Sequence, residues 1–272
     1  MQSITSFVKR YPQPVFWAIA WATGFYGFYM YTQDGNEMWQ FLTFGSFLGG
    51  LLVTALADGR GGVKEYLSRI VRWKVGIKWY AAALFLPLFL RVVALGANLA
   101  SGAQLASNIQ IPPAGDLIGD FLIVLLVIAL GEEPGFRGFA LPRFLTTRTA
   151  LSAGLWVGVL HMIWHIPLFM TGADSWWVVL IVIAGGVINT WFFVHTRGSV
   201  FICMFLHAAV NLSASVFSSF FAGPDVERQT FWLAMAFVAF AIGLVLATGV
   251  ELGRKPEAAA VEPAMEKLEA AG

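Results

Sequence analysis

Long apolar runs, separated by short polar stretches, dominate the pattern of this chain. Eight of them are near the ~20 residues that a helix needs to cross the hydrocarbon core of a bilayer. We predict membrane spans at roughly 14–32, 39–57, 79–98, 115–133, 151–170, 176–195, 199–221 and 231–250. Unbroken apolar runs, without strict alternation, favour helices over the strands of a membrane barrel. The expected fold class is therefore an all-α polytopic membrane protein with about eight transmembrane helices.

Composition and charge agree with a membrane protein. The 272 residues are 58% hydrophobic and 12% charged, whereas soluble domains average about 45–50% and about 25%. The lipid bilayer is thus the first expected partner. A net charge of +1 gives no reason to expect nucleic acid. The only cysteine, Cys203, excludes an internal disulfide. We expect a single transmembrane domain over 1–253 and a disordered, Ala/Glu/Pro-rich cytoplasmic tail over 254–272.

Basic residues are distributed unevenly between the predicted loops. Except for Arg91 and Arg228, all 17 lysines and arginines lie in the N-terminus, the even-numbered loops or the C-terminus. The positive-inside rule then predicts that both termini are cytoplasmic, and we expect a bacterial inner (plasma) membrane. The segment VKEYLSRIVRWK, residues 63–74, predicts an interfacial amphipathic helix, and the alternative is an ordinary basic loop.

A few polar side chains fall inside the predicted spans, where such groups are costly and are usually functional. They are Arg91, Glu132, Glu133, His161, His165, Asn189, His207 and Asn211. Counting 1.5 Å per residue along each span, we expect three different spans to bring Glu, His and Asn to one polar cavity, open to the cytoplasmic half. The predicted catalytic core is about 115–221.

Helical spacing predicts which of these side chains lie on the same face of a helix. Glu133 and Arg137 are four residues apart and predict an ion pair at the membrane surface. Glu132, about 100° around the helix, is then free to do chemistry. A glutamate in an apolar site can act as a general base on water, and histidine or asparagine can donate to an oxyanion. The set predicts a hydrolase of acyl compounds.

Less specific interpretations stay open at this stage. A lone histidine in a span often serves only as a hydrogen-bond partner between helices, and the two glutamates could simply cap a helix end. HMIWH has the histidine spacing of the zinc motif H-E-x-x-H, but Met162 stands where the glutamate is required. The residues therefore do not support that class of zinc protease.

Three motifs, in order, resemble the CPBP family of intramembrane endopeptidases, also called the CAAX protease or Abi family. They are EEPGFR at Glu132–Arg137, MIWHIPLF around His165, and HAAVN at His207–Asn211. The resemblance covers roughly residues 128–215. It implies eight transmembrane helices around a conical cavity and a Glu/His-activated water that attacks a peptide bond. In prenyl-protein members the substrates are C-terminal CAAX tails, cut after the lipidated cysteine.

By this resemblance Glu132 is the general base and His165 its partner on the water. His207 and Asn211 would stabilise the oxyanion, and Glu133 and Arg137 would support the site. One position departs from the family pattern, because His161 stands where an aromatic residue precedes the second-motif histidine. The sequence leaves open which of His161 and His165 is the main histidine of that motif.

The need for a metal is also open. Members are often called metalloproteases, so zinc held by His165 and His207 is one expectation, and metal-free chemistry is the other. Two further functions are alternatives to a protease. One is a non-catalytic membrane module for peptide binding or immunity. The other is a proton-coupled transporter, which the lack of an internal repeat disfavours.

Overall fold

The computed structural model describes residues 2–254, in which all regular structure is helical. The chain runs through α1 (Gln2–Arg10), α2 (Pro12–Asp34), η1 (Glu37–Thr43), α3 (Phe44–Ile70), α4 (Ile77–Ala100), α5 (Ala114–Ile123), η2 (Val124–Ile128), α6 (Ala129–Glu133), η3 (Pro134–Ala140), α7 (Leu141–Phe144), α8 (Ala150–Trp164), α9 (Ile166–Met170), α10 (Val178–His195), α11 (Val200–Phe217) and α12 (Pro224–Thr248). The predicted disordered tail lies outside the described residues, apart from Arg254. The all-α fold class is confirmed.

The predicted count of eight spans is not confirmed. Six helices within residues 2–254 are long and apolar enough to cross a membrane. Each of the other two predicted spans still coincides with helix. The first is α2, a 23-residue helix that carries several Tyr and Trp residues. The second breaks after 15 residues of α8, because Pro167 cannot donate a hydrogen bond and its ring clashes with the preceding turn.

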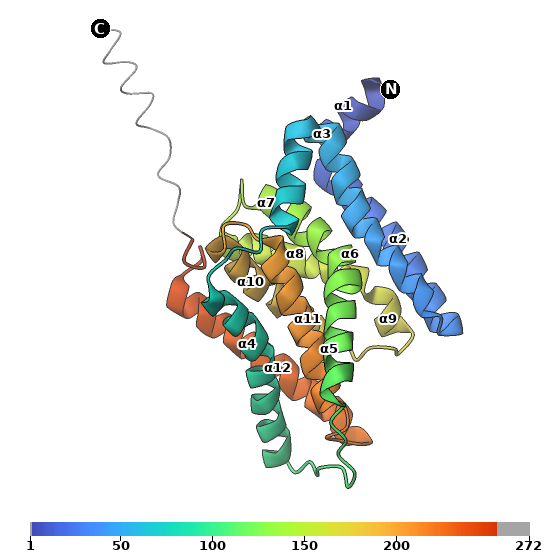
Figure 1. Ribbon diagram of the computed structural model, residues 1–272, viewed down its shortest axis with the longest axis vertical. Helices are drawn as coiled ribbons and strands as arrows, with labels where there is room; N and C mark the ends of the chain where they lie inside the picture. The colour runs from blue at the N-terminus through green and yellow to red at the C-terminus, as the bar shows by residue number, and fades with distance from the viewer. Residues whose placement is uncertain (1, 255–272) are drawn as a thin grey trace.

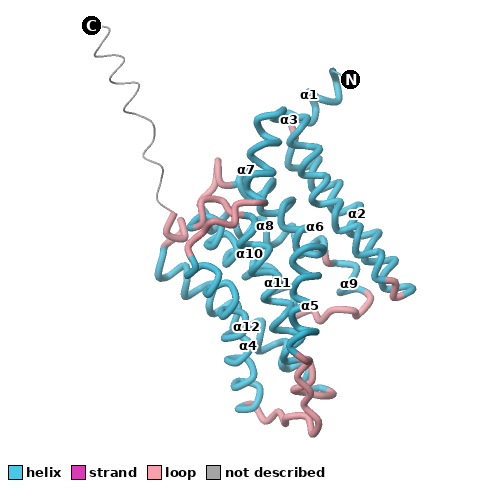
Figure 2. The backbone as a smooth tube through the Cα atoms, viewed as in Figure 1, coloured by secondary structure: helices cyan, strands magenta, loops and turns pink. Residues whose placement is uncertain are grey.

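The helices pack into two neighbouring groups (Figure 1). On one side α2 lies along α3, and α3 packs against η3. On the other side α4 packs against α11 and α12, α10 packs against α12, and α8 packs against α10. The helix that runs from α5 to α7 lies between the groups, because α6 contacts both α3 and α11. Helix makes up almost the whole bundle, and short loops connect it (Figure 2).

Hydrogen bonds between loops show that the chain alternates direction. The Ser199 hydroxyl donates to the Arg72 carbonyl at 2.6 Å, which joins the loop after α3 to the loop before α11. The Ala106 amide donates to the Phe220 carbonyl at 2.9 Å, which joins the loop after α4 to the loop after α11. The second and sixth loops therefore meet at one end of the bundle, and the third and seventh meet at the other, as the predicted topology requires. Which end is cytoplasmic stays a prediction.

The predicted amphipathic helix at 63–74 is confirmed only to Ile70. A non-helical Gly59, with φ +67° and ψ −157°, kinks α3 before this segment. Tyr66 and Ile70 then face inward, and the Tyr66 hydroxyl donates to the Phe47 carbonyl at 2.9 Å. From Val71 onward the predicted helix is wrong. The chain turns there, and the Trp73 amide donates to the Val71 carbonyl at 2.9 Å.

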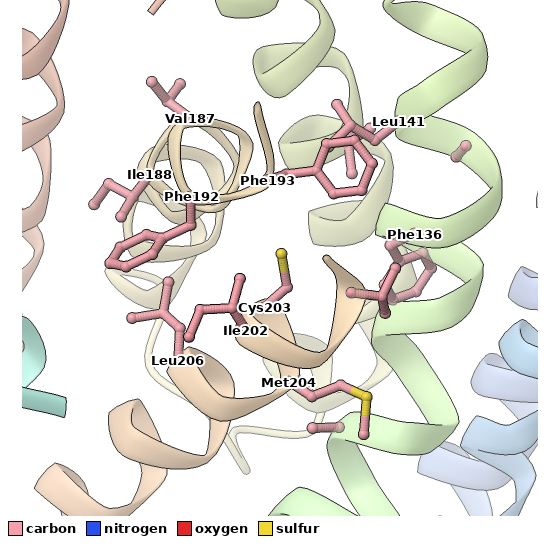
Figure 3. Close-up of a cluster of buried hydrophobic side chains, with 14 of the residues drawn as sticks. Phe136, Leu141, Val187, Ile188, Phe192, Phe193, Ile202, Cys203, Met204 and Leu206 are labelled. Atoms are coloured by element: carbon pink, nitrogen blue, oxygen red, sulfur yellow. The ribbon is translucent and has the colours of Figure 1, made fainter. Parts of the chain in front are cut away.

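A buried apolar cluster holds η3, α10 and α11 together (Figure 3). Phe136 and Leu141 approach it from the η3–α7 side, and Phe192 lies on α10. Cys203 and Ile202 of α11 are fully buried in the same cluster. This packing fixes the relative position of η3 and α11, which carry parts of the first and third sequence motifs, and α10 packs in turn against α8, which leads into the second.

Candidate active site

The two glutamates lie within a helix rather than at its end. We expected the fourth span to stop at Glu133, but the helix continues through the π-helical η3 to Phe144. Pro134 removes one backbone donor inside this continuous helix, but its φ of −57° is helical, and the hydrogen-bonding pattern changes to π-helical from this residue on. Glu132 and Glu133 are 3% and 1% exposed. The interpretation of the two glutamates as a polar cap at a helix end is therefore wrong, while the place where the span leaves the membrane stays a prediction.

Close packing against α3 holds the helix of the glutamates in place. A Cβ atom at Gly135 would lie 2.0 Å from the Ser46 hydroxyl oxygen and 2.6 Å from the Ser46 carbonyl oxygen. Only glycine allows this approach. The Ser46 hydroxyl in turn donates to the Glu132 carbonyl at 3.2 Å. Gly135 therefore sets the position of the glutamates relative to α3.

Glu133 is held by two donors. Arg137 Nη1 donates to Glu133 Oε1 at 3.1 Å, and His207 Nδ1 lies 3.0 Å from the same oxygen. The predicted Glu133–Arg137 pair is thus present. The two side chains are 1% and 3% exposed, so the pair lies inside the protein, and its predicted place at the membrane surface stays a prediction. A buried carboxylate with two donors suits a structural role, since it orients both partners.

Glu132 faces His161. Its Oε2 atom lies 3.4 Å from His161 Nε2 and 4.0 Å from His207 Nδ1. Arg137 Nη1 lies 3.4 Å from His161 Nδ1, and since arginine can only donate, Nδ1 is the acceptor. A neutral His161 therefore carries its proton on Nε2, toward Glu132. Both facing atoms are buried without a hydrogen-bonding geometry to any protein group among the described residues, so a shared third group would satisfy them.

His165 lies at the break between α8 and α9. Its Nδ1 lies 3.1 Å from the His161 carbonyl oxygen, and its ring stacks on Phe28 at a centroid distance of 5.7 Å. The two histidine rings are 4.8 Å apart. On α11, Asn211 Nδ2 donates to the His207 carbonyl at 3.1 Å, which leaves its second N–H unused.

One cavity of ≈ 510 Å³ brings all these groups together. It is lined by every predicted site residue, namely Glu132, Glu133, Arg137, His161, His165, His207 and Asn211. Arg91 and Asn189 line it as well, and so does Asp174 from the loop before α10. The sequence reading missed Asp174 because it considered only polar residues inside spans. Burial of its carboxyl raises the pKa of Asp174 above the ordinary value.

The side chains present do not form a metal site. Among residues 2–254, no group of three or more His, Cys, Asp or Glu side chains is arranged to hold a metal ion. The two histidines expected as zinc ligands, His207 and His165, use Nδ1 on Glu133 and on a backbone carbonyl, so each keeps Nε2 and the pair offers two ligand atoms. Structural and catalytic zinc sites need at least three protein ligands. The donor set therefore does not fit zinc.

Comparisons with known proteins agree with the motifs. Residues 114–213 match the family described as "Type II CAAX prenyl endopeptidase Rce1-like". The chain is also 22% identical, over 238 residues, to the "CAAX prenyl protease 2" of Methanococcus maripaludis, and the alignment covers 81% of this chain and 88% of that protein. The matched region runs from α5 to α11 and contains all three motifs. Together with its apolar helices, these matches identify the chain as an integral membrane protein that is similar to the CPBP family of intramembrane endopeptidases over the region that carries the three motifs.

Proposed function

We propose that this protein hydrolyses a peptide bond near the C-terminus of a prenylated protein or peptide, by means of a water activated by Glu132 and a histidine. The observation that carries the proposal is the pair of facing, otherwise unpaired atoms, Glu132 Oε2 and His161 Nε2, inside the cavity. Similarity to this family supports peptidase activity in the membrane. The roles of individual residues are our inference.

The first step is activation of water. A water in the cavity beside this 3.4 Å pair, within reach of both atoms, would accept from His161 Nε2–H and donate to the Glu132 carboxylate. Glu132 takes its proton while the oxygen bonds to the scissile carbonyl carbon. General-base catalysis of this kind contributes about 10²- to 10⁴-fold. The family resemblance assigns the water partner to His165, whereas the geometry favours His161, since His161 is the one within 3.4 Å of Glu132.

The second step is stabilisation of the tetrahedral oxyanion. His207 holds Glu133 through Nδ1, so in its imidazolium form it can donate to the oxyanion through Nε2. The unused N–H of Asn211 Nδ2 is a neutral donor from the same helix face. When the carbon–nitrogen bond breaks, Glu132 returns its proton to the leaving amine, which restores the carboxylate.

The test is proteolysis of a farnesylated CAAX peptide in liposomes. We expect Glu132→Gln to reduce kcat by about 10²-fold or more while leaving the thermal midpoint unchanged. Glu37→Gln, an exposed carboxylate on η1, is the matched control and should cleave like the parent protein. Activity that survives a chelator would support a metal-free mechanism, and loss that zinc restores would contradict it. Equal cleavage by the Glu132→Gln variant would refute the assigned base.

A further inference from the structure

Arg91 places a positive charge in the cavity away from the glutamates. It lies on α4, and its Nε donates to the Ser213 hydroxyl on α11 at 2.8 Å. Arg91 and Ser213 both line the cavity. Among residues 2–254 no carboxylate lies within ion-pair distance of its guanidinium, whose Nη groups have no hydrogen-bond partner among the same residues. An arginine inside a span is costly unless something pairs with it.

The other charged groups of the cavity are already used or lie elsewhere. Glu133 is neutralised by Arg137, and Glu132 faces His161. Asp174 lines the same cavity, but it forms no ion pair with Arg91. Among the described residues, the guanidinium thus has no ion-pair partner in the cavity, and four of its five N–H donors remain in a fork that matches a carboxylate.

Its distance from the reacting groups can be estimated along α11. Ser213 follows His207 by six residues, which corresponds to about 9 Å at 1.5 Å per residue. Val210 and Asn211 lie between them on α11 and line the cavity, as do Leu233 and Phe237 of α12. The cavity therefore extends from His207 to the guanidinium along a wall that is apolar except for Asn211.

We propose that Arg91 binds the terminal α-carboxylate of the substrate. The proposal rests on the proposed function, because a tail cut after the cysteine of a CAAX sequence carries three residues beyond the scissile bond. Three extended residues reach about 10–11 Å, which matches the estimated distance. The two aliphatic side chains of such a tail would lie along the apolar wall, and the carboxylate would meet the guanidinium at its end.

This arrangement makes Arg91 a specificity residue. It selects free C-termini over internal peptide bonds, because an internal segment has no carboxylate to offer. It also selects tail length, since one residue more or fewer moves the carboxylate by about 3.3–3.6 Å. Ser213 acts through Arg91 as a positioning residue, because its hydroxyl fixes Nε and leaves the two Nη groups for the ligand.

The experiment compares one farnesylated tail with a free carboxylate and the same tail amidated at its C-terminus. Cleavage is measured with the parent protein, with Arg91→Gln, and with Arg60→Gln as a control that removes an exposed arginine. We expect amidation to lower kcat/KM of the parent and of Arg60→Gln by about 10- to 100-fold, as for loss of a charge-assisted hydrogen bond. The Arg91→Gln variant should cleave both tails slowly and equally, with the change in KM. Equal cleavage of both tails by the parent, or the same preference in Arg91→Gln, would overturn the proposal.

A binding measurement tests the role of Arg91 independently of the proposed function. Affinity of a fluorescent tail is measured in the Glu132→Gln background, where no turnover is needed. Preference for the carboxylate, lost with Arg91→Gln, would support the proposal even if the parent protein cleaved nothing. Absence of that preference would overturn it whatever the activity. If Arg91→Gln does not fold, Arg91→Lys replaces it, and we expect a smaller preference because lysine lacks the forked donors. An unchanged preference in that variant would count against the proposal.

Discussion

Arg137 lies against His161, with Nη1 3.4 Å from Nδ1, while the same nitrogen donates to Glu133 at 3.1 Å. One guanidinium therefore connects the helix of the glutamates to α8. This contact fixes the tautomer of His161, because an arginine cannot accept a hydrogen bond. The arginine of EEPGFR has two tasks: it neutralises the structural carboxylate, and it orients the histidine that faces Glu132.

The Arg137→Ala variant should be less stable to unfolding than the parent protein. Breaking a buried ion pair by removing one partner costs about 3–5 kcal/mol, because the remaining charge stays buried and uncompensated. We expect a clearly lower midpoint in thermal unfolding of the detergent-solubilised protein. The control is Arg148→Ala, which removes an exposed arginine near the start of α8. An Arg137→Ala midpoint equal to that of the control would show that the buried pair does not stabilise the fold.

The two histidines of α8 should differ in effect. His161→Ala removes the group that faces Glu132, so kcat should fall by about 10²-fold or more. His165→Ala removes a ring that lines the cavity and stacks on Phe28. We therefore expect this variant to change KM more than kcat. The measurement is steady-state cleavage of a farnesylated peptide by both variants. The opposite ranking, with kcat lost mainly in His165→Ala, would return the role of water partner to His165.

Cys203 should be inaccessible in the folded protein. Its side chain is fully buried, and its Sγ lies 3.5 Å from the Ser199 carbonyl oxygen. We expect no mass increase after treatment with N-ethylmaleimide in mild detergent, and complete modification after denaturation in SDS. Rapid labelling under native conditions would mean that α11 does not pack against η3 and α10 as described.

Local patterns were enough to predict most of the helices and the polar residues that line the cavity. The apolar runs gave the helical segments, and i, i+4 spacing gave the Glu133–Arg137 pair. The contact between Glu132 and His161 could not be predicted, because it depends on how α8 packs against η3. The end of the helix that carries the glutamates was misplaced for a similar reason. Gly131, Pro134 and Gly135 are typical of a helix end, but here the π-helical turn and the contact with α3 keep the helix intact.

Gly135→Ala tests that contact directly. The added methyl group would lie 2.0 Å from the Ser46 hydroxyl oxygen and 2.6 Å from the Ser46 carbonyl oxygen, so α3 must move away. Overpacking of this kind costs about 1–3 kcal/mol, and the shift would displace Glu132 through its bond to Ser46. We expect a lower thermal midpoint together with reduced peptide cleavage.

The matched control is Gly119→Ala, which lies on the same continuous helix, in α5. A Cβ atom there meets no other atom within 4 Å. Alanine is the better helix former by about 1 kcal/mol, so this variant should be as stable as the parent protein or slightly more so, with normal activity. The contrast isolates packing from helix propensity, since both changes are the same substitution. If Gly135→Ala behaved like Gly119→Ala, α3 could not be what holds the glutamates in position.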